Sequence, residues 1–378
     1  MTTKELVPGL AGIPAAESAV SFIDGTIGIL EYRGYRIEDL SAHASYEEVA
    51  WLLLYGELPT KAELAAFSSD LERLRVLPTE LVDMLRAFPK GAHPMRALQA
   101  SLAGLGMVSP GVDLKDAASR DEAARRVIAS APVLVAAWER IRSGKDYVAP
   151  QAGLSTAGNF LWCLDGEVPS AIATRTLDCA LVLHAEHTMN ASTFACRVVA
   201  STMNDPYTSC SAAVGALFGP LHGGANEVVL KQLQSIGKRE NVGAWYAAKR
   251  DKKEKVMGFG HRVYKTKDPR AFNLQRLATQ LFAELGTTPL YDIALGLEEL
   301  VTADLGPRGI YPNVDFFSGL VYEKLGLHTD VFTPIFAMAR VSGYCAHWLE
   351  QMLDNKLFRP GQIYVGRRER DWQPIEAR

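Results

Sequence analysis

The strongest constraint on the fold is a succession of helix-start signals separated by short turns. The segment SYEEVAWLLLYG begins with a capping box, in which Ser45 and Glu48 satisfy free backbone N–H groups, and it ends at Gly56. Thr60 and Glu63, in TKAE, repeat the same start signal after a short turn. A chain punctuated in this way is expected to be built mainly from helices.

The same pattern continues toward the middle of the chain. Turns are expected at residues 77–79 (LPT) and 88–91 (FPKG), and a long amphipathic helix is expected from about Asp121 to Arg142. Residues 176–202, TLDCALVLHAEHTMNASTFACRVVAST, are apolar on most faces and too long for a strand. We therefore expect a single helix there, buried in a large helical body.

Strand signals are confined to the N-terminal segment SAVSFIDGTIGILEYRG. It carries β-branched and aromatic residues around Asp24-Gly25, a dipeptide that favours the positive backbone angles of a tight hairpin turn. No repeat of 20 to 50 residues and no low-complexity linker is visible. The predicted fold class is all-α, with a short N-terminal β-hairpin.

Composition narrows the possible functions. The chain has 378 residues, of which 48% are hydrophobic, enough for one large domain or two ordinary ones. A formal charge of -3 gives no electrostatic footprint for nucleic acid or an anionic membrane. Five cysteines, scattered in apolar stretches, indicate buried thiols of a reduced protein. Without a signal peptide or an apolar run of membrane-spanning length, we expect a soluble cytoplasmic protein.

Three segments place a titratable residue in an unusual setting. They contain His222 in GPLHGGAN, His261 in GFGHRVYKTKDPR and Asp315 in YPNVDFFSG. The apolar neighbours of Asp315, among them Val314 and Phe316, should desolvate its carboxylate and raise its pKa, as a general base requires. On the residues alone, a turn histidine and a helix-capping aspartate remain alternatives.

Further polar groups lie in apolar surroundings. Arg340 shares a helical face with Phe336 and Tyr344, so it needs a carboxylate partner from the protein or from a ligand. His184 and His187 are three residues apart, a spacing that could bind a metal ion. No HExxH motif and no third ligand support a metal site, so a histidine that binds a polar ligand is the better interpretation.

Together these segments resemble the citrate synthase family. GFGHRVYKTKDPR is similar to the family's signature, and GPLHGGAN, HAEHTMNAST and PNVDFFSG resemble its other characteristic segments. The resemblance extends over nearly the whole chain, from FIDG near the N-terminus to LFRPGQIYVG near the C-terminus. The resemblance implies an all-helical homodimer whose two domains close over the substrate. With the glycine-rich seams as boundaries, we expect a large domain of residues 1–222 and 322–378 and an inserted small domain of residues 223–321.

The resemblance also implies catalytic roles. Asp315 would remove a proton from the acetyl methyl of acetyl-CoA, while His222 would hydrogen-bond the thioester oxygen of the forming enol. His261 would donate to the oxaloacetate carbonyl as carbon attacks it, and hydrolysis of citryl-CoA would release citrate and CoA. Acetyl-CoA is then a substrate, and neither a separate cofactor nor a metal is expected.

The cations take binding roles under the same resemblance. Arg270, Arg340 and Arg359 would hold the two carboxylates of oxaloacetate, and His187 would lie on the carbonyl side. Arg359 would reach in from the partner subunit, so that dimerisation is a catalytic requirement. Arg262 and Lys265 are expected to contact the phosphates of CoA.

Three alternatives stay open. 2-Methylcitrate synthase shares the fold and chemistry but uses propionyl-CoA, and one methylene discriminates by only about 1–3 kcal/mol in an apolar pocket. A noncatalytic helical scaffold or ligand sensor would not need the three titratable residues together. An NAD-linked dehydrogenase would need a dinucleotide fingerprint and alternating strands, which are missing. The short segment before FIDG favours a plain dimer without NADH control.

Overall fold

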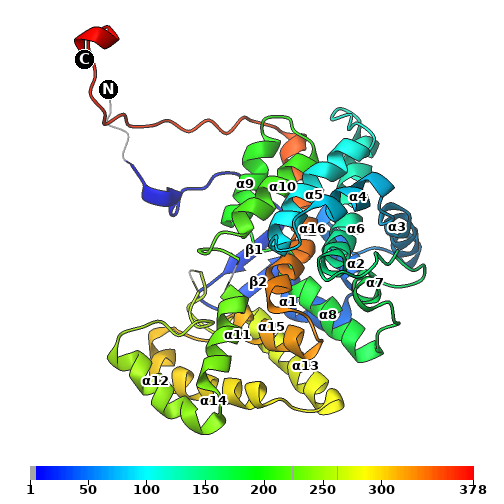
Figure 1. Cartoon of the computed structure of the whole chain (residues 1–378), viewed down its shortest axis with the longest axis vertical. Helices are drawn as coiled ribbons and strands as arrows, with labels where there is room; N and C mark the ends of the chain where they lie inside the picture. Colours follow the sequence, from blue (N-terminus) through cyan, green and yellow to red (C-terminus); the bar gives the residue numbers. More distant parts are fainter. Residues whose placement is uncertain (1–5, 224, 262) are drawn as a thin grey trace.

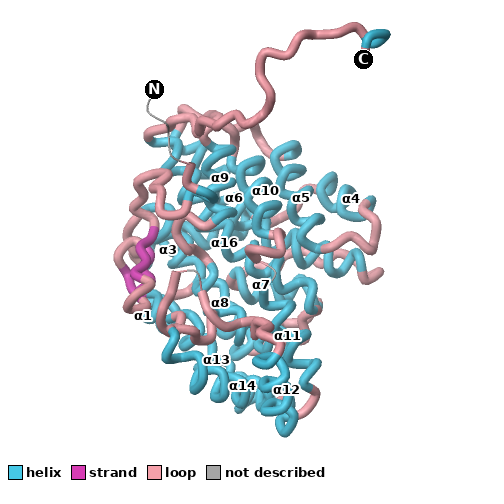
Figure 2. The backbone as a smooth tube through the Cα atoms, turned by 90° about the vertical axis from the view of Figure 1, so that its left-hand side faces the viewer, coloured by secondary structure: helices cyan, strands magenta, loops and turns pink. Residues whose placement is uncertain are grey.

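The computed structural model describes residues 6–223, 225–261 and 263–378, and it is mostly helical, as predicted (Figures 1 and 2). A three-stranded antiparallel sheet lies near the N-terminus, in the order β1 (Ser21–Asp24), β2 (Ile29–Tyr32), β3 (Tyr35–Arg36). The described helices are α1 (Ile37–His43), α2 (Tyr46–Tyr55), α3 (Lys61–Leu74), α4 (Thr79–Ala87), α5 (Pro94–Val108), α6 (Ala117–Arg142), α7 (Thr156–Asp165), α8 (Ala171–His184), α9 (Ala191–Ala200), α10 (Pro206–Leu217), α11 (Ala225–Ile236), α12 (Val242–Asp251), α13 (Pro269–Leu285), α14 (Pro289–Leu305), α15 (Val314–Lys324) and α16 (Phe332–Leu353).

The predicted helix starts are confirmed. The backbone N–H of Ser45 donates to a carboxylate oxygen of Glu48 at 2.7 Å, and that of Thr60 donates to Glu63 at 2.8 Å. Both capping boxes are complete, because each cap side chain also accepts from the third helical N–H group. Gly56 ends α2 in the left-handed conformation, with φ of 95°.

Helix α16 is the centre of the larger helical group. It is buried over almost its whole length and packs against α2, α6, α8, α9 and α10. A helix that is apolar on most faces is stable only inside such a bundle. The polar residues on α16 are therefore held inside the protein, and Arg340 is one of them.

A second group of helices lies at the other end of the molecule. Helices α11 and α13 pack on α15, and α12 packs on α14 (Figure 1). The two groups touch where α13 meets α8 and where α11 meets α16. The division of the chain at residues 223–321 stays a prediction.

The prediction of one continuous helix over residues 176–202 is wrong. Helix α8 ends at His184, residues 185–190 are not helical, and Thr188 adopts a left-handed conformation with φ of 50°. The side chain of Asn190 caps α9 by accepting two backbone N–H groups at 3.1 Å. The two histidines of HAEH therefore do not share a helical face, which removes the geometric basis for a paired metal site.

The hairpin is present, but its turn differs from the prediction. Asp24 pairs with Ile29, so the connection has four residues, Gly25 to Gly28, and the positive φ of 73° falls at Gly28. The side chain of Asp24 accepts the N–H of Thr26 at 2.9 Å, which supports the wider loop.

The hairpin loop packs against the segment that follows His261. The carbonyl oxygen of Gly25 accepts the backbone N–H of Lys265 at 2.8 Å. A Cβ atom at Gly25 would overlap the carbonyl group of Val263, and one at Gly28 would lie 2.7 Å from the methyl of Thr266. Glycine is thus required for this close approach of two distant segments.

The chain beyond α16 leaves the helical body. It runs away from the bundle to the C-terminus and is mostly exposed (Figure 1). Val365 and Trp372 expose 92% and 77% of their surface, so this segment does not bury its apolar side chains within one chain. All five cysteines are free and buried, as predicted. Among the helices of the described ranges, none is both long and apolar enough to cross a bilayer.

Gly25→Ala tests the contact between the hairpin and the segment after His261. The added methyl group must displace the Val263 backbone, so we expect the free energy of unfolding to fall by about 1–3 kcal/mol in denaturant titrations. Gly91→Ala is the matched control, since a Cβ there meets nothing within 4 Å. An equal effect of the two substitutions would contradict the packing role.

Candidate active site

The glycines of GFGH allow two segments to pair beside the site. Gly258 and Gly260 have φ of 84° and 80°, in the left-handed region that favours glycine. The N–H of Gly260 donates to the carbonyl of Tyr311 at 2.8 Å, and the N–H of Asn313 donates to the carbonyl of Gly258 at 2.9 Å. This short antiparallel pairing links the segment that carries His261 to the segment that begins α15.

The geometry around His261 fixes its tautomer. Its Nδ1 atom faces the backbone N–H groups of Val263 at 3.0 Å and Tyr264 at 3.3 Å, which can only donate. Nδ1 is therefore the acceptor, and Nε2 carries the proton. Burial, followed by the positive charge of Arg270, lowers the pKa of His261 to about 4, so the ring is a neutral donor near pH 7.

Asp315 lies in the first turn of α15, where Asn313 is the N-cap. The Asn313 side chain accepts the N–H of Asp315 at 3.1 Å and donates to the carbonyl of Gly260 at 3.0 Å. Burial raises the pKa of Asp315 to about 6, against the opposing effect of Arg270. The predicted direction of this shift is confirmed.

His222 lies in the turn after α10. Its Nε2 atom is 2.8 Å from the hydroxyl of Ser192 and 3.3 Å from the Ser192 backbone N–H. Nε2 also lies 3.2 Å from the side-chain oxygen of Asn190, which can only accept, so these contacts hold the ring in place without fixing which nitrogen carries the proton. Burial, followed by the charge of Arg340, lowers the pKa of His222 to about 4. Tyr344 on α16 steadies the contact by donating to the Ser192 hydroxyl at 2.7 Å.

Arg340 is a buried cation without a carboxylate partner in the described chain. Its Nε atom donates to the carbonyl of His184 at 2.6 Å, and its guanidinium carbon lies 4.7 Å from the centre of the Phe336 ring. Nη2 is buried and forms no hydrogen bond with the described residues. A buried donor left in this state indicates a site for an anionic ligand.

Arg270 differs from Arg340 in having an internal partner. Asp268 accepts from its Nε and Nη2 atoms at 3.0 and 2.8 Å, and both side chains are buried. Asp268 also caps α13 by accepting the N–H of Arg270. Nη1 donates no hydrogen bond to the described residues. Only this part of the guanidinium is therefore free to bind a ligand. The sequence predicts that Arg270 binds a substrate carboxylate, but it does not predict the ion pair with Asp268.

The described site residues lie close enough together for the charges of the arginines to shift the pKa values of the other groups. Arg270 influences the pKa values of His187, His261 and Asp315, and Arg340 influences those of His187, His222 and Asp315. The rings of His187 and His261 are 5.3 Å apart. Burial, followed by Arg270, lowers the pKa of His187 well below its usual value. Segments far apart in the sequence thus form one cluster.

The other predicted residues lie outside this cluster or outside the described chain. Lys265 is exposed beside His261, and its charge acts on that ring. Arg359 is exposed in the C-terminal segment and donates only to the adjacent carbonyl of Pro360 at 3.1 Å within the described chain. Arg262 lies outside the described residues.

A pocket of about 860 Å³ opens beside His261. Residues 250–261 and 305–313 contribute its walls, and its apolar surface includes Phe259 and Ile310. Its charged rim was not predicted, although the run KRDKKEK is visible in the sequence. The lining cations are Arg250, Lys253, Lys255 and Arg308.

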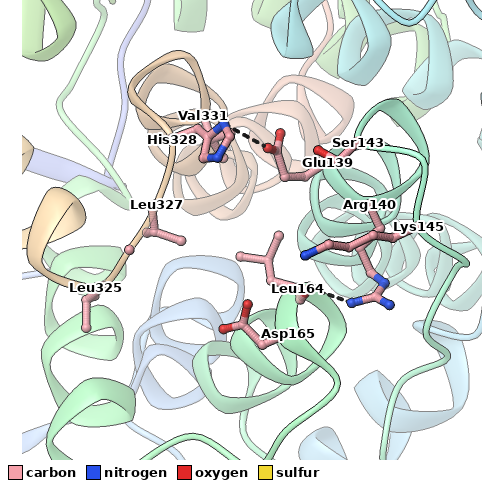
Figure 3. Close-up of a pocket in the computed structure, with 11 residues that line it drawn as sticks. Glu139, Arg140, Ser143, Lys145, Leu164, Asp165, Leu325, Leu327, His328 and Val331 are labelled. Atoms are coloured by element: carbon pink, nitrogen blue, oxygen red, sulfur yellow. Dashed lines mark hydrogen bonds and ion pairs between the residues drawn. The ribbon is translucent and has the colours of Figure 1, made fainter.

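A second pocket is smaller and lies apart from the cluster. Figure 3 shows it between the ends of α6 and α7 and the segment after α15, where His328 contacts Glu139 at 3.5 Å. Asp315 lies in the first turn of α15 and this pocket lies past the other end of that helix, roughly 15 Å away at 1.5 Å per residue. Its volume of about 130 Å³ is below the usual range for a small-molecule site. No group of three potential metal ligands occurs among the residues that the structure describes.

Several groups in the cluster were missed from the sequence. Asn190, Ser192 and Tyr344 orient His222, and Asp268 holds Arg270. The sequence does carry a signal for Asn190 and Asp268, because Asn190-Ala-Ser-Thr and Asp268-Pro-Arg are both typical of helix N-caps. Their side chains serve the cap and the site together.

Known proteins resemble this chain over almost its whole length. Residues 9–361 match the family model described as "Citrate synthase, C-terminal domain". Citrate synthase from Synechocystis is 50% identical over 379 residues, which cover the whole of this chain and 96% of the relative. The crystal structure of citrate synthase from Pyrobaculum aerophilum has a TM-score of 0.93 at 39% identity, covering 99% of this chain and 95% of that one.

A third relative is a ternary complex. The structure of citrate synthase from Thermoplasma acidophilum with carboxymethyl coenzyme A and oxaloacetate has a TM-score of 0.93 at 33% identity, covering both chains completely. The helical fold and these likenesses define an enzyme of the acyltransferase class. The chain belongs to the citrate synthase family.

Arg340→Met tests whether this arginine serves ligand binding instead of stability. Methionine fills similar space without a buried charge, so we expect the free energy of unfolding without ligand to rise, or to fall by less than about 1 kcal/mol. Oxaloacetate, the ligand expected from the sequence, should raise the melting temperature of the parent protein but not of the variant.

Arg142→Met is the control for this test. Arg142 contacts both Glu139 and Asp330 at 2.6 Å, so its removal should cost about 1–2 kcal/mol and leave the ligand response intact. A strong loss of stability in Arg340→Met with an unchanged ligand response would assign Arg340 to the core alone.

Proposed function

We propose that the protein catalyses the condensation of acetyl-CoA with oxaloacetate and water to give citrate and CoA. The observation that carries the proposal is Asp315, a carboxylate whose pKa is raised to about 6 by burial and on which the charges of the buried Arg270 and Arg340 act. The relatives named citrate synthase, and the ternary complex with oxaloacetate and a CoA analogue, support it.

The first step is enolisation of the acetyl group. Asp315 removes a proton from the methyl carbon, and the electron pair moves into the carbonyl, so that negative charge develops on the thioester oxygen. A thioester methyl is a very weak acid, so a donor is needed at that oxygen; one fixed donor contributes roughly 3–4 kcal/mol. In this proposal His222 meets the need as a neutral ring with its proton on Nδ1, while Nε2 contacts Ser192 and Asn190.

The second step forms the carbon–carbon bond. The enol carbon attacks the ketone of oxaloacetate, and His261 gives its Nε2 proton to the carbonyl oxygen that becomes the citryl hydroxyl. The two backbone donors at Nδ1 favour this direction of transfer. Water then adds to the citryl thioester and gives a proton back to His261, the C–S bond breaks, and the thiolate takes up the proton held by Asp315, so that citrate and CoA leave.

Oxaloacetate binds through its two carboxylates. Arg340 contributes Nη2, and Arg270 contributes the part of its guanidinium that Asp268 does not occupy. His187 lies beside the ring of His261, on the carbonyl side. Charge-assisted hydrogen bonds of this kind are about twice as strong as neutral ones, which suits a small, doubly charged substrate.

CoA binds in the pocket of about 860 Å³ beside His261. The apolar wall suits the adenine, and the cations of the rim suit the phosphates. Lys265 is retained as a further contact, because it is exposed beside His261. Arg262, which lies outside the described residues, is retained from the sequence prediction alone.

Dimerisation completes the site in this proposal. Arg359 is exposed on a segment that leaves its own helical body, a position from which it can reach a second subunit. The partner's Arg359 would supply the third cation for oxaloacetate. Residues 223–321 would form the small domain that closes over both substrates, and the five free cysteines support the predicted cytoplasmic location.

The test is release of CoA in the presence of oxaloacetate, with acetyl-CoA and propionyl-CoA compared by kcat/KM. We expect a preference for acetyl-CoA. A preference for propionyl-CoA would change the reaction to 2-methylcitrate synthesis with the same mechanism. If folded protein released no thiol with either substrate, the catalytic proposal would be wrong.

Asp315→Asn and a pH profile identify the base in the same assay. The substitution should lower kcat by about 10²–10⁴-fold, whereas Asp83→Asn, an exposed change on α4, should not. The base must be deprotonated, so kcat/KM should fall as the pH drops through about 6, the raised pKa of Asp315. Both histidines have a pKa of about 4 and stay neutral across that range.

Mixed dimers test the origin of Arg359. Arg359→Ala and His261→Ala should each be inactive alone, but a heterodimer would contain one site with neither change. Random exchange of equal amounts should restore about a quarter of the parental activity, because half of the dimers are mixed and each has one intact site. Confirmed subunit exchange without recovery would place Arg359 outside the partner's site.

A further inference from the structure

Tyr264 is the buried aromatic residue that touches both central histidines. Only 1% of its surface is exposed. Its ring centre lies 4.8 Å from that of His261 and 5.7 Å from that of His187. It therefore lies inside the cluster.

The hydroxyl of Tyr264 has one hydrogen-bond partner among the described residues, Nε2 of His187 at 3.3 Å. Burial raises the pKa of Tyr264 above its usual value, so the phenol keeps its proton, and the imidazole of His187 is neutral. If His187 donated from Nε2, the buried phenol hydrogen would have no acceptor, which is costly. Donation from Tyr264 to Nε2 satisfies both groups and leaves the proton of His187 on Nδ1.

The backbone of Tyr264 acts on the other histidine. Its N–H donates to Nδ1 of His261 at 3.3 Å, beside the shorter contact from Val263. His261 therefore carries its proton on Nε2. The hairpin loop holds the backbone at Tyr264 in place, because the N–H of the next residue, Lys265, donates to the carbonyl of Gly25.

We propose that Tyr264 is a positioning residue that sets the tautomers of His187 and His261 in opposite senses, through its hydroxyl and its backbone N–H. The inference rests on the proposed function, in which His261 donates to oxaloacetate and His187 lies on its carbonyl side. His187 then donates only from Nδ1, and His261 only from Nε2. One residue thereby gives two adjacent histidines different donor atoms.

Tyr264→Phe removes the hydroxyl and keeps the ring and the backbone N–H. We expect the Kd and KM for oxaloacetate to rise about fivefold, the fold change equivalent to the loss of one hydrogen bond of about 1 kcal/mol. The KM for acetyl-CoA should stay unchanged. Tyr291→Phe is the matched control, because Tyr291 is also buried and its hydroxyl has a partner, Thr279, at 2.7 Å in the α13–α14 pair.

A double-mutant cycle separates this role from packing. His187→Asn retains a donor near the position of Nδ1, whereas His187→Gln places its amide nearer to Nε2, so the Asn variant should bind oxaloacetate more tightly. In the His187→Asn background, Tyr264→Phe should have no further effect, because the accepting nitrogen is gone. An undiminished effect of Tyr264→Phe there would overturn the proposal.

Ring ¹⁵N shifts of histidine-labelled protein give a direct readout. In the parent protein the His187 signals should show a proton on Nδ1, and in Tyr264→Phe they should show a mixture of tautomers, while those of His261 stay the same. A His187 ring protonated on Nε2 in the parent would contradict the inference. Activity of the parent in the same preparation distinguishes this outcome from failure of the proposed function, which would abolish thiol release with every variant.

Discussion

The rest of the structure must stabilise two guanidinium groups that are buried in a helical core, those of Arg270 and Arg340. Arg270 is neutralised by Asp268, while Arg340 has only a carbonyl oxygen and the face of Phe336 in the described chain. Burial of such a charge is unfavourable, and the extensive apolar packing of α16 and its neighbours offsets it. The fold thus keeps positive charge where water is scarce, which strengthens its attraction for an anionic ligand.

The site is built from the ends and interruptions of helices. Asn190 and Asn313 are N-caps, Asp315 lies in a first turn, and His222 follows the end of α10. Helix interiors in this bundle are mostly occupied by packing, with Arg340 and Tyr344 within α16 as exceptions, whereas helix ends carry unpaired backbone groups that polar side chains satisfy. In an all-helical protein, these ends are where side chains can serve both backbone and substrate.

Much of this arrangement could be predicted from the sequence, for physical reasons. Capping boxes and the glycine at the end of α2 depend on local hydrogen bonds, so their sequence signals are reliable. The interruption between α8 and α9 was missed, because apolar residues on both sides continue the helical pattern and the cap at Asn190 was not weighed against it. The pair formed by Arg270 and Asp268, and the contacts of Ser192 with His222, depend on side-chain geometry that spacing does not encode.

The pairing between residues 258–260 and 311–313 has a consequence for how the site can change. The proposed proton donor His261 directly follows one of these segments, and the proposed base Asp315 follows the other, with the Asn313 side chain bonded to the backbone of both Gly260 and Asp315. These two residues therefore keep their separation while the pairing is intact, and a displacement of the paired segments changes their distances from residues on other segments, among them His187, His222 and Arg340. Under the proposed function, the pairing thus makes acid and base one unit, which takes up its position relative to the substrate as a whole.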